Sequence, residues 1–218
     1  MVDVTVRVLE PADSYSFMTL EDAKIFLGIS AEDTSQDAQL QMTIDMNSAS
    51  IARMVNRVFG KEKVEETWRC VGPVCCPDGT CRVFLMRWPL KAADIESVES
   101  PRGNLLDPAS YEVEEESGKL TLLNGCSSEI VIVYTGGYDL PEEAPLELQQ
   151  ATGILTRESR TQAAQEAVSG IRMIAHKEAR VMFHSPAQSS STTRTGGAGS
   201  AATRAVEDLL THFTRYWI

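Results

Sequence analysis

Residues 130–141 read IVIVYTGGYDLP, and this stretch decides the fold because the pattern of the chain changes within it. Ile130–Tyr134 has the β-branched and aromatic composition of a short strand. Gly136 and Gly137 then mark a turn. Pro145 follows at a place suited to the first position of a helix. The stretch therefore predicts a boundary between a β-domain and a helix.

Upstream of this boundary, the sequence predicts five more short strands, separated by turns rich in Gly, Pro, Asp and Ser. Alternation of apolar and charged residues favours antiparallel pairing with one solvated face. The strands predict a small antiparallel β-domain within residues 61–140. They are expected at Val64–Val71, Arg82–Met86, Ile95–Ser100, Tyr111–Glu115 and Lys119–Leu123.

Further upstream, residues 19–60 predict a helical hairpin with a short acidic loop. The first helix ends at Gly28. The second is expected to end at Gly60 and to expose Arg53 and Arg57 on the face opposite its apolar stripe. That stripe consists of Leu40, Ile44, Ile51, Val55 and Phe59.

Two segments flank these units. Residues 1–18 predict an extended N-terminal arm, with the option of a strand added to a neighbour's sheet. Residues 141–188 predict a helix that returns to the helical body, plus a possible hairpin. Residues 171–184 fit either a continued helix or that hairpin, and the alternation in Arg180–Phe183 favours the hairpin.

The C-terminal part of the chain combines a linker and a helix. Residues 189–202 are dominated by Ser, Thr, Gly and Ala, which predicts a flexible linker. Residues 203–218 return to a helical apolar stripe and predict a short docking helix. Its docking site is open between its own domain and another chain. The expected class is α+β: a helical body, an inserted β-domain and a tethered C-terminal helix.

Charge and hydropathy exclude two classes of partner. The net charge is −11, and residues 1–156 carry 12 basic and 26 acidic side chains against 8 and 5 in residues 157–218. Tight binding to a phosphate backbone needs clustered Lys and Arg, so sequence-specific DNA binding is not expected. No run approaches the roughly 20 apolar residues of a membrane helix, so no membrane partner is expected.

Four cysteines lie within twelve residues in a C-x4-C-C-x4-C spacing. Zinc knuckles use shorter spacings, so we favour reduced thiols packed in or beside a hairpin. A zinc-stabilised binding module is the alternative interpretation. Its ligands would be Cys70, Cys75, Cys76 and Cys81.

Nothing in the chain indicates catalysis. The three histidines have no carboxylate or cysteine at motif spacing, and Gly136-Gly137 lacks the spacing of a phosphate-binding loop. No serine or cysteine lies in a nucleophile elbow. We expect no enzymatic activity, no catalytic residue and no cofactor.

Several collinear segments resemble the head–tail connector (adaptor) family of long-tailed bacteriophages. No segment is specific alone, but their order covers most of the chain. The cysteine hairpin and the Ser/Gly linker depart from the family pattern. The segments are Leu20–Ile29, Asn56–Gly60, Trp68, Trp88–Leu90, Ile95–Val98, Ser110–Val113, Val133–Tyr138 with Pro141, and Val206–Leu210 before Phe213 and Arg215-Tyr216.

This resemblance implies a structural virion protein in the neck between capsid and tail, assembled in the host cytoplasm. It implies a homo-oligomeric, dodecameric ring under the portal protein, with tail-side stopper or tail-completion proteins below and DNA passing through. It also implies that the C-terminal segment reaches the portal. Aromatic residues dominate interface energetics, so the expected portal contacts are Leu209, Leu210, Phe213, Arg215, Tyr216 and Trp217.

Overall fold

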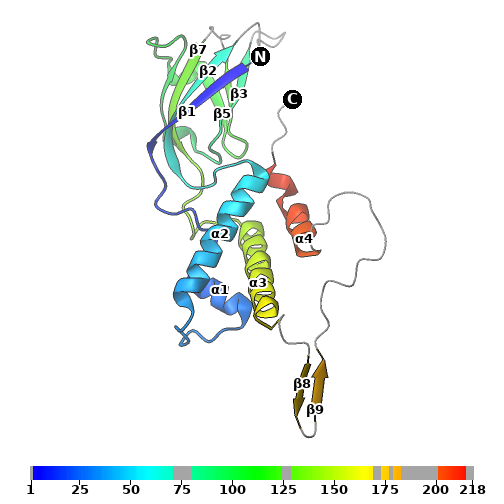
Figure 1. Ribbon diagram of the computed structural model, residues 1–218. Coiled ribbons are helices and arrows are strands. Elements are labelled where there is room, and N and C mark those ends of the chain that lie inside the picture. Colours follow the sequence, from blue (N-terminus) through cyan, green and yellow to red (C-terminus); the bar gives the residue numbers. More distant parts are fainter. Residues whose placement is uncertain are drawn as a thin grey trace, which may run out of the picture.

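The computed structural model describes residues 2–70, 80–123, 129–168, 173–176, 179–182 and 201–214. Both helices and antiparallel sheets are present, so the predicted α+β class is confirmed. The four-stranded and three-stranded sheets lie at one end of the molecule, and three of the helices pack side by side below them (Figure 1).

The larger sheet contains four antiparallel strands in the order β1-β2-β7-β4. They are β1 (Val2–Glu10), β2 (Glu62–Cys70), β7 (Glu129–Gly136) and β4 (Ile95–Glu99). The N-terminal arm therefore does not need a neighbour's sheet. It pairs with β2 of its own chain, and Val4 and Val6 of β1 pack against the same core as β2.

The smaller sheet has three antiparallel strands in the order β3-β6-β5. They are β3 (Cys81–Phe84), β6 (Lys119–Leu122) and β5 (Tyr111–Glu114), and 3-10 turns at Ala92–Asp94 and Pro108–Ser110 precede β4 and β5. The inner faces of both sheets share one apolar core, as alternating side chains of paired strands do. Each of the six predicted strands overlaps an observed one.

The helical hairpin begins with α1 (Leu20–Leu27), capped by the Thr19 hydroxyl, which accepts a hydrogen bond from the Asp22 amide at 3.1 Å. Gly28 ends α1 with a left-handed φ of 69°, as a C-cap glycine does.

Helix α2 (Asp37–Val55) is shorter than predicted. Asn56 adopts a left-handed conformation with φ 53° and ends the helix, so Gly60 does not. Phe59 continues the apolar spacing of the helix but reaches the core from a loop. Arg57 also leaves the helix and is buried, so its predicted solvent-facing position is wrong.

Helix α3 (Leu146–Val168) runs beside α2, and α4 (Ala201–Leu210) packs against α3 (Figure 1). A short 3-10 turn, η4 (Thr211–Phe213), follows α4. In the segment open between helix and hairpin, β8 (Met173–His176) pairs with β9 (Ala179–Met182). Residues 189–200 of the predicted linker lie outside the described residues. No helix in the described ranges has both the length and the apolar character needed to cross a membrane.

The chain passes between the helical body and the β-domain near Gly60 and again near Tyr138, and these two segments contact each other. Gly60 and Tyr138 form a parallel bridge, in which the Tyr138 amide donates to the Phe59 carbonyl at 2.8 Å and the Lys61 amide donates to the Tyr138 carbonyl at 2.9 Å. Gly137, with φ 112°, lies against the Gly60 carbonyl. The glycine pair expected only as a turn is thus also the point where the two parts of the molecule touch.

Candidate partner-binding site

The C-terminal helix docks on its own chain. Val206 and Leu210 of α4 are buried in the apolar cluster of the helical body, beside Leu148, Ala151 and Leu155 of α3. The high amphipathicity of α4 explains this, because its apolar stripe needs a partner surface. Of the two docking sites left open by the sequence, the structure has the one within the chain.

The residues expected to contact the portal therefore divide into three groups. Leu210 is only 3% exposed and Phe213 is half-buried, so both hold the C-terminal segment to the body. Leu209 is partly exposed. Arg215, Tyr216 and Trp217 lie outside the described residues.

Phe213 is fixed by an aromatic cluster at the end of α2. Its ring meets that of Phe59 edge-on, with centroids 5.6 Å apart. Phe59 also meets Phe17 edge-on at 5.2 Å and stacks on Tyr138 at 6.5 Å. Edge-to-face pairs at such distances add about 0.5–1.5 kcal/mol beyond burial. Four distant segments of the chain thus meet at Phe59.

Arg57 lies at the centre of the same cluster, and sequence reasoning missed it. Its guanidinium carbon is 3.2 Å from the centre of the Trp88 ring, 4.4 Å from that of Phe59 and 5.9 Å from that of Phe213. It also donates a hydrogen bond to the Trp88 carbonyl oxygen. A buried guanidinium over aromatic faces is a strong cation–π arrangement. It couples the end of α2, the loop before β4 and the C-terminal segment.

A second polar cluster fixes the junction from the other side. The Arg87 Nε donates to Glu62 Oε2 at 2.6 Å, and the Tyr15 hydroxyl donates to Glu62 Oε1 at 2.6 Å. The hydrogen bond to Glu62, together with burial, raises the pKa of Tyr15. The side chains of Glu62 and Arg87 are nearly buried. Together with Tyr15, they hold the segment between β1 and α1 to the β-domain.

Inside the β-domain, the carboxyl group of Glu66 is fully buried. It accepts hydrogen bonds from the Met86 amide at 2.8 Å, from the Trp68 indole at 3.1 Å and from the Tyr134 hydroxyl. Burial raises the pKa of Glu66, and burial beside Glu66 also raises the pKa of Tyr134. The site is enclosed and all its partners are internal, so we interpret it as structural.

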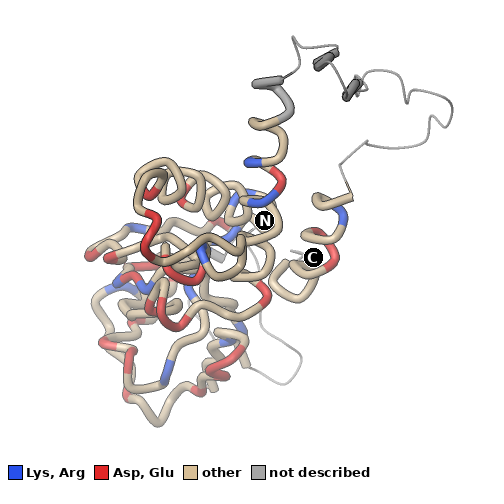
Figure 2. The backbone as a smooth tube through the Cα atoms, turned by 90° about the horizontal axis from the view of Figure 1, so that it is seen from below, with Lys and Arg blue, Asp and Glu red and all other residues tan. Residues whose placement is uncertain are grey.

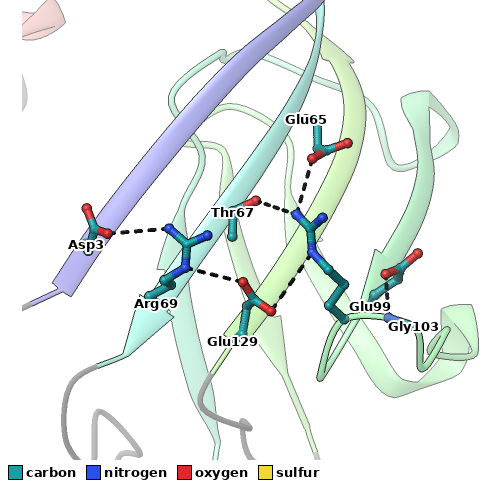
Figure 3. A network of polar contacts seen from close by, with 8 residues as sticks. Asp3, Glu65, Thr67, Arg69, Glu99, Gly103 and Glu129 are labelled. Atoms are coloured by element: carbon teal, nitrogen blue, oxygen red, sulfur yellow. Dashed lines mark hydrogen bonds and ion pairs between the residues drawn. The ribbon is translucent and has the colours of Figure 1, made fainter.

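The outer face of the larger sheet carries a row of ion pairs (Figure 3). Arg69 lies 3.5 Å from Asp3 and 3.3 Å from Glu129. Arg102 lies 3.3 Å from Glu65 and 4.0 Å from Glu129. Each arginine here is held by carboxylates of the same chain. Acidic and basic residues are interspersed along the described backbone (Figure 2).

The predicted cysteine site cannot be assembled from the described residues. Cys81 is fully buried in the core of the β-domain. The side chain of Cys70 and the residues Cys75 and Cys76 lie outside the described part of the structure. Among the side chains that are described, no three His, Cys, Asp or Glu residues are grouped closely enough to hold a metal ion.

Two hollows of about 230 and 250 Å³ lie on the described surface. The first is a groove between the start of α2 and the end of α3, lined by Leu40, Thr43 and Arg160. The second lies at the junction, between Asp13, Lys61 and Tyr138. Both are below the volume of about 300–1,000 Å³ that is usual for small-molecule sites.

Comparison with known proteins gives one family and one fold. Residues 17–73 match the model of the phage gp6-like head-tail connector protein family, and no curated protein sequence matches the chain. A chain of a structure described as the neck of an empty GTA particle, computed with C6 symmetry, is 11% identical, with a TM-score of 0.56 over 98% of this chain and 97% of that one. A chain of the virion of a native gene transfer agent particle is 12% identical, with a TM-score of 0.52 over 98% and 96%. At these identities the structural likeness concerns the fold alone, whereas the family match confirms the resemblance to head–tail connectors.

Proposed function

We propose, from the match of residues 17–73 to the model of the phage gp6-like head-tail connector family, that this chain is a structural neck protein of a tailed phage or phage-like particle. The matched segment spans α1, α2 and β2, and it includes Phe17, Arg57 and Phe59 of the aromatic cluster. The fold shared over nearly the whole chain with proteins of gene transfer agent particles supports the same assignment. The family match is the observation that carries the proposal.

In this function, copies of the chain form a ring, a dodecamer, beneath the portal protein and above the tail-side proteins. Its work is assembly and not catalysis. Symmetric rings use two different surfaces of each subunit, one for each neighbour. The tight junction built by Arg57, Glu62 and Arg87 suits such a subunit, because it fixes the β-domain relative to the helices.

The C-terminal segment is the proposed contact with the portal. Leu210 and Phe213 anchor it, and Leu209, Arg215, Tyr216 and Trp217 make the contact itself. Phe213 is held where α2 ends, close to the border between the two parts of the molecule, so the residues after Thr214 start from a fixed point.

The charge of the chain agrees with a channel for DNA. The net charge is −11, and the arginines on the outer face of the larger sheet are held by carboxylates of their own sheet. A DNA conduit must not bind its cargo tightly, and a surface that repels phosphates meets this need.

Electron microscopy of the purified chain, alone and mixed with its portal protein or with tail-less heads, tests the proposal. We expect ring-shaped density beneath the portal when this chain is present and none when it is omitted. A chain that stays monomeric with the portal, and adds no density below it, would refute the proposal. Monomers in the absence of the portal would not bear on the neck assignment, so the mixed sample is the deciding one.

A further inference from the structure

The loop of residues 85–91, between β3 and β4, carries a tryptophan that contacts two other parts of the molecule. The Arg57 guanidinium carbon lies 3.2 Å from the centre of the Trp88 ring. The Cβ of Trp88 also packs against Gly118, so closely that a Cβ added to this glycine would lie 2.8 Å from it. Gly118 belongs to the turn between β5 and β6. Trp88 therefore connects the end of α2 to the smaller sheet.

Three hydrogen bonds between backbone groups hold this loop to its surroundings. They run from the Leu85 amide to the Gly118 carbonyl at 2.9 Å, from the Leu90 amide to the Glu115 carbonyl at 3.1 Å and from the Gly137 amide to the Pro89 carbonyl at 2.9 Å. Two of them reach the β5–β6 turn and one reaches the junction with the helical body. We call the three donors the loop amides, because their hydrogen bonds last only while the loop keeps its position.

The C-terminal segment reaches the same guanidinium through Phe213. The centre of the Phe213 ring lies 5.9 Å from the Arg57 guanidinium carbon, within the range of a cation–π contact. Phe213 precedes residues 215–217 by a single residue, Thr214. Because each residue has only two soft backbone dihedrals, a partner that orders residues 215–217 also restrains Phe213.

We propose that Phe213 couples the C-terminal segment to the smaller sheet through Arg57 and Trp88. While Phe213 is docked, the guanidinium is held against the Trp88 ring and the loop keeps its hydrogen bonds to the β5–β6 turn. By linkage, a partner that holds the C-terminal segment in place also stabilises this loop. The coupling is a property of the single chain, whereas its use by the portal rests on the proposed function.

Burial of the guanidinium explains why the loss of one ring is felt at another. Arg57 is 8% exposed, and Phe213 is one of the rings around it. A cation–π contact is strongest when the cation is shielded from water. Removal of the Phe213 ring admits water beside the guanidinium, so the attraction between Arg57 and Trp88 weakens although neither residue has changed.

Hydrogen exchange of the purified full chain, measured residue by residue by NMR, tests the coupling. Phe213→Ala should speed the exchange of the loop amides by about fivefold or more, the lower end of usual coupling strengths. The amides that pair β2 with β7 should exchange as in the wild type. Unchanged exchange of the loop amides in this variant overturns the inference.

Ile154→Ala is the matched control. Ile154 is half-buried like Phe213 and packs against the same apolar cluster of the helical body, but it is not among the aromatic contacts of Arg57. Its replacement should leave the loop amides unchanged. Equal acceleration by Ile154→Ala and Phe213→Ala would mean that general loosening of the helical body is the cause, and the inference fails.

Two further measurements test the route and its use. In an Arg57→Met background, Phe213→Ala should add less than about a twofold change at the loop amides, because the coupling residue is already gone. A full additional effect would exclude the route through Arg57. Portal rings added to the wild-type chain should slow the loop amides, and rings that bind without slowing them contradict the coupling. Rings that do not bind the chain refute the proposed function instead, and the single-chain variants then decide the inference alone.

Discussion

The guanidinium of Arg57 lies 3.2 Å from the centre of the Trp88 ring and donates a hydrogen bond to the carbonyl oxygen of the same residue. One side chain thus binds both the face and the backbone of a residue in the loop between β3 and β4. Because Phe59 and Phe213 lie around the same guanidinium, this pair connects the two parts of the molecule to the C-terminal segment.

Replacement of Arg57 tests this connection. Arg57→Met keeps most of the side-chain length but removes the charge and the hydrogen bond. We expect the free energy of unfolding to fall by about 2 kcal/mol or more, the value of a desolvated cation–π contact. Urea unfolding followed by tryptophan fluorescence measures it, since Trp88 reports directly on the site.

Arg53→Met is the matched control for this change. Arg53 is exposed, and its Nη2 donates a hydrogen bond to the Ser50 hydroxyl oxygen at 3.3 Å. Its replacement should alter stability by less than about 0.5 kcal/mol. Equal effects of the two replacements would contradict the role assigned to Arg57.

Glycine at position 137 is expected to be indispensable. Its φ is 112°, and a Cβ at this position would overlap the carbonyl oxygen of Gly60. Gly137→Ala should therefore destabilise the chain by about 3 kcal/mol or more, above the roughly 1–2 kcal/mol of a left-handed residue alone. Gly103→Ala separates the two causes, because Gly103 has φ 88° but an open surrounding. Thermal unfolding that gave the same loss for both variants would show that backbone strain alone decides.

The sequence predicts the local elements well and their partners poorly. Each strand of the β-domain follows from alternation and turn residues, which are local signals. The pairing of β1 with β2 does not follow from the sequence. A helical hairpin separates the two strands along the chain, so no local pattern indicates that they pair. For this reason the sequence leaves open that the N-terminal arm adds a strand to a neighbour's sheet.

Arg57 illustrates the same limit at the candidate site. Apolar periodicity continues through Phe59, so the sequence predicts a helix that ends at Gly60, with Arg57 on the face opposite the apolar stripe. The left-handed Asn56 ends the helix earlier. The aromatic partners of Arg57 come from three other segments, and only the tertiary fold brings them together.

Glu66 predicts a dependence of stability on pH. Burial raises its pKa, so the folded chain holds the proton more tightly than the unfolded chain. This contribution is fully present below the ordinary glutamate pKa and is lost as the pH rises through the raised value. The wild type should therefore become less stable relative to Glu66→Gln as the pH rises from 4 to 8, as measured by urea unfolding. Glu112→Gln, on an exposed position of β5, should show no such shift, and a constant difference for Glu66→Gln would contradict a raised pKa.

In the proposed function, Leu210 and Phe213 anchor the C-terminal segment, and the residues after Thr214 contact the portal. A chain that ends at Thr214 keeps Val206, Leu210 and Phe213, which make the docking contacts with the helical body. Its unfolding midpoint should stay close to that of the wild type, while its affinity for portal rings should fall at least tenfold, because Arg215, Tyr216 and Trp217 are gone. Leu210→Ala is the reverse control: it keeps these residues but should cost about 2–5 kcal/mol, the range for a buried leucine. Sedimentation with portal rings measures the affinity. A truncated chain that still binds the portal like the wild type would move the contact away from the C-terminus, to surfaces that the truncation leaves intact.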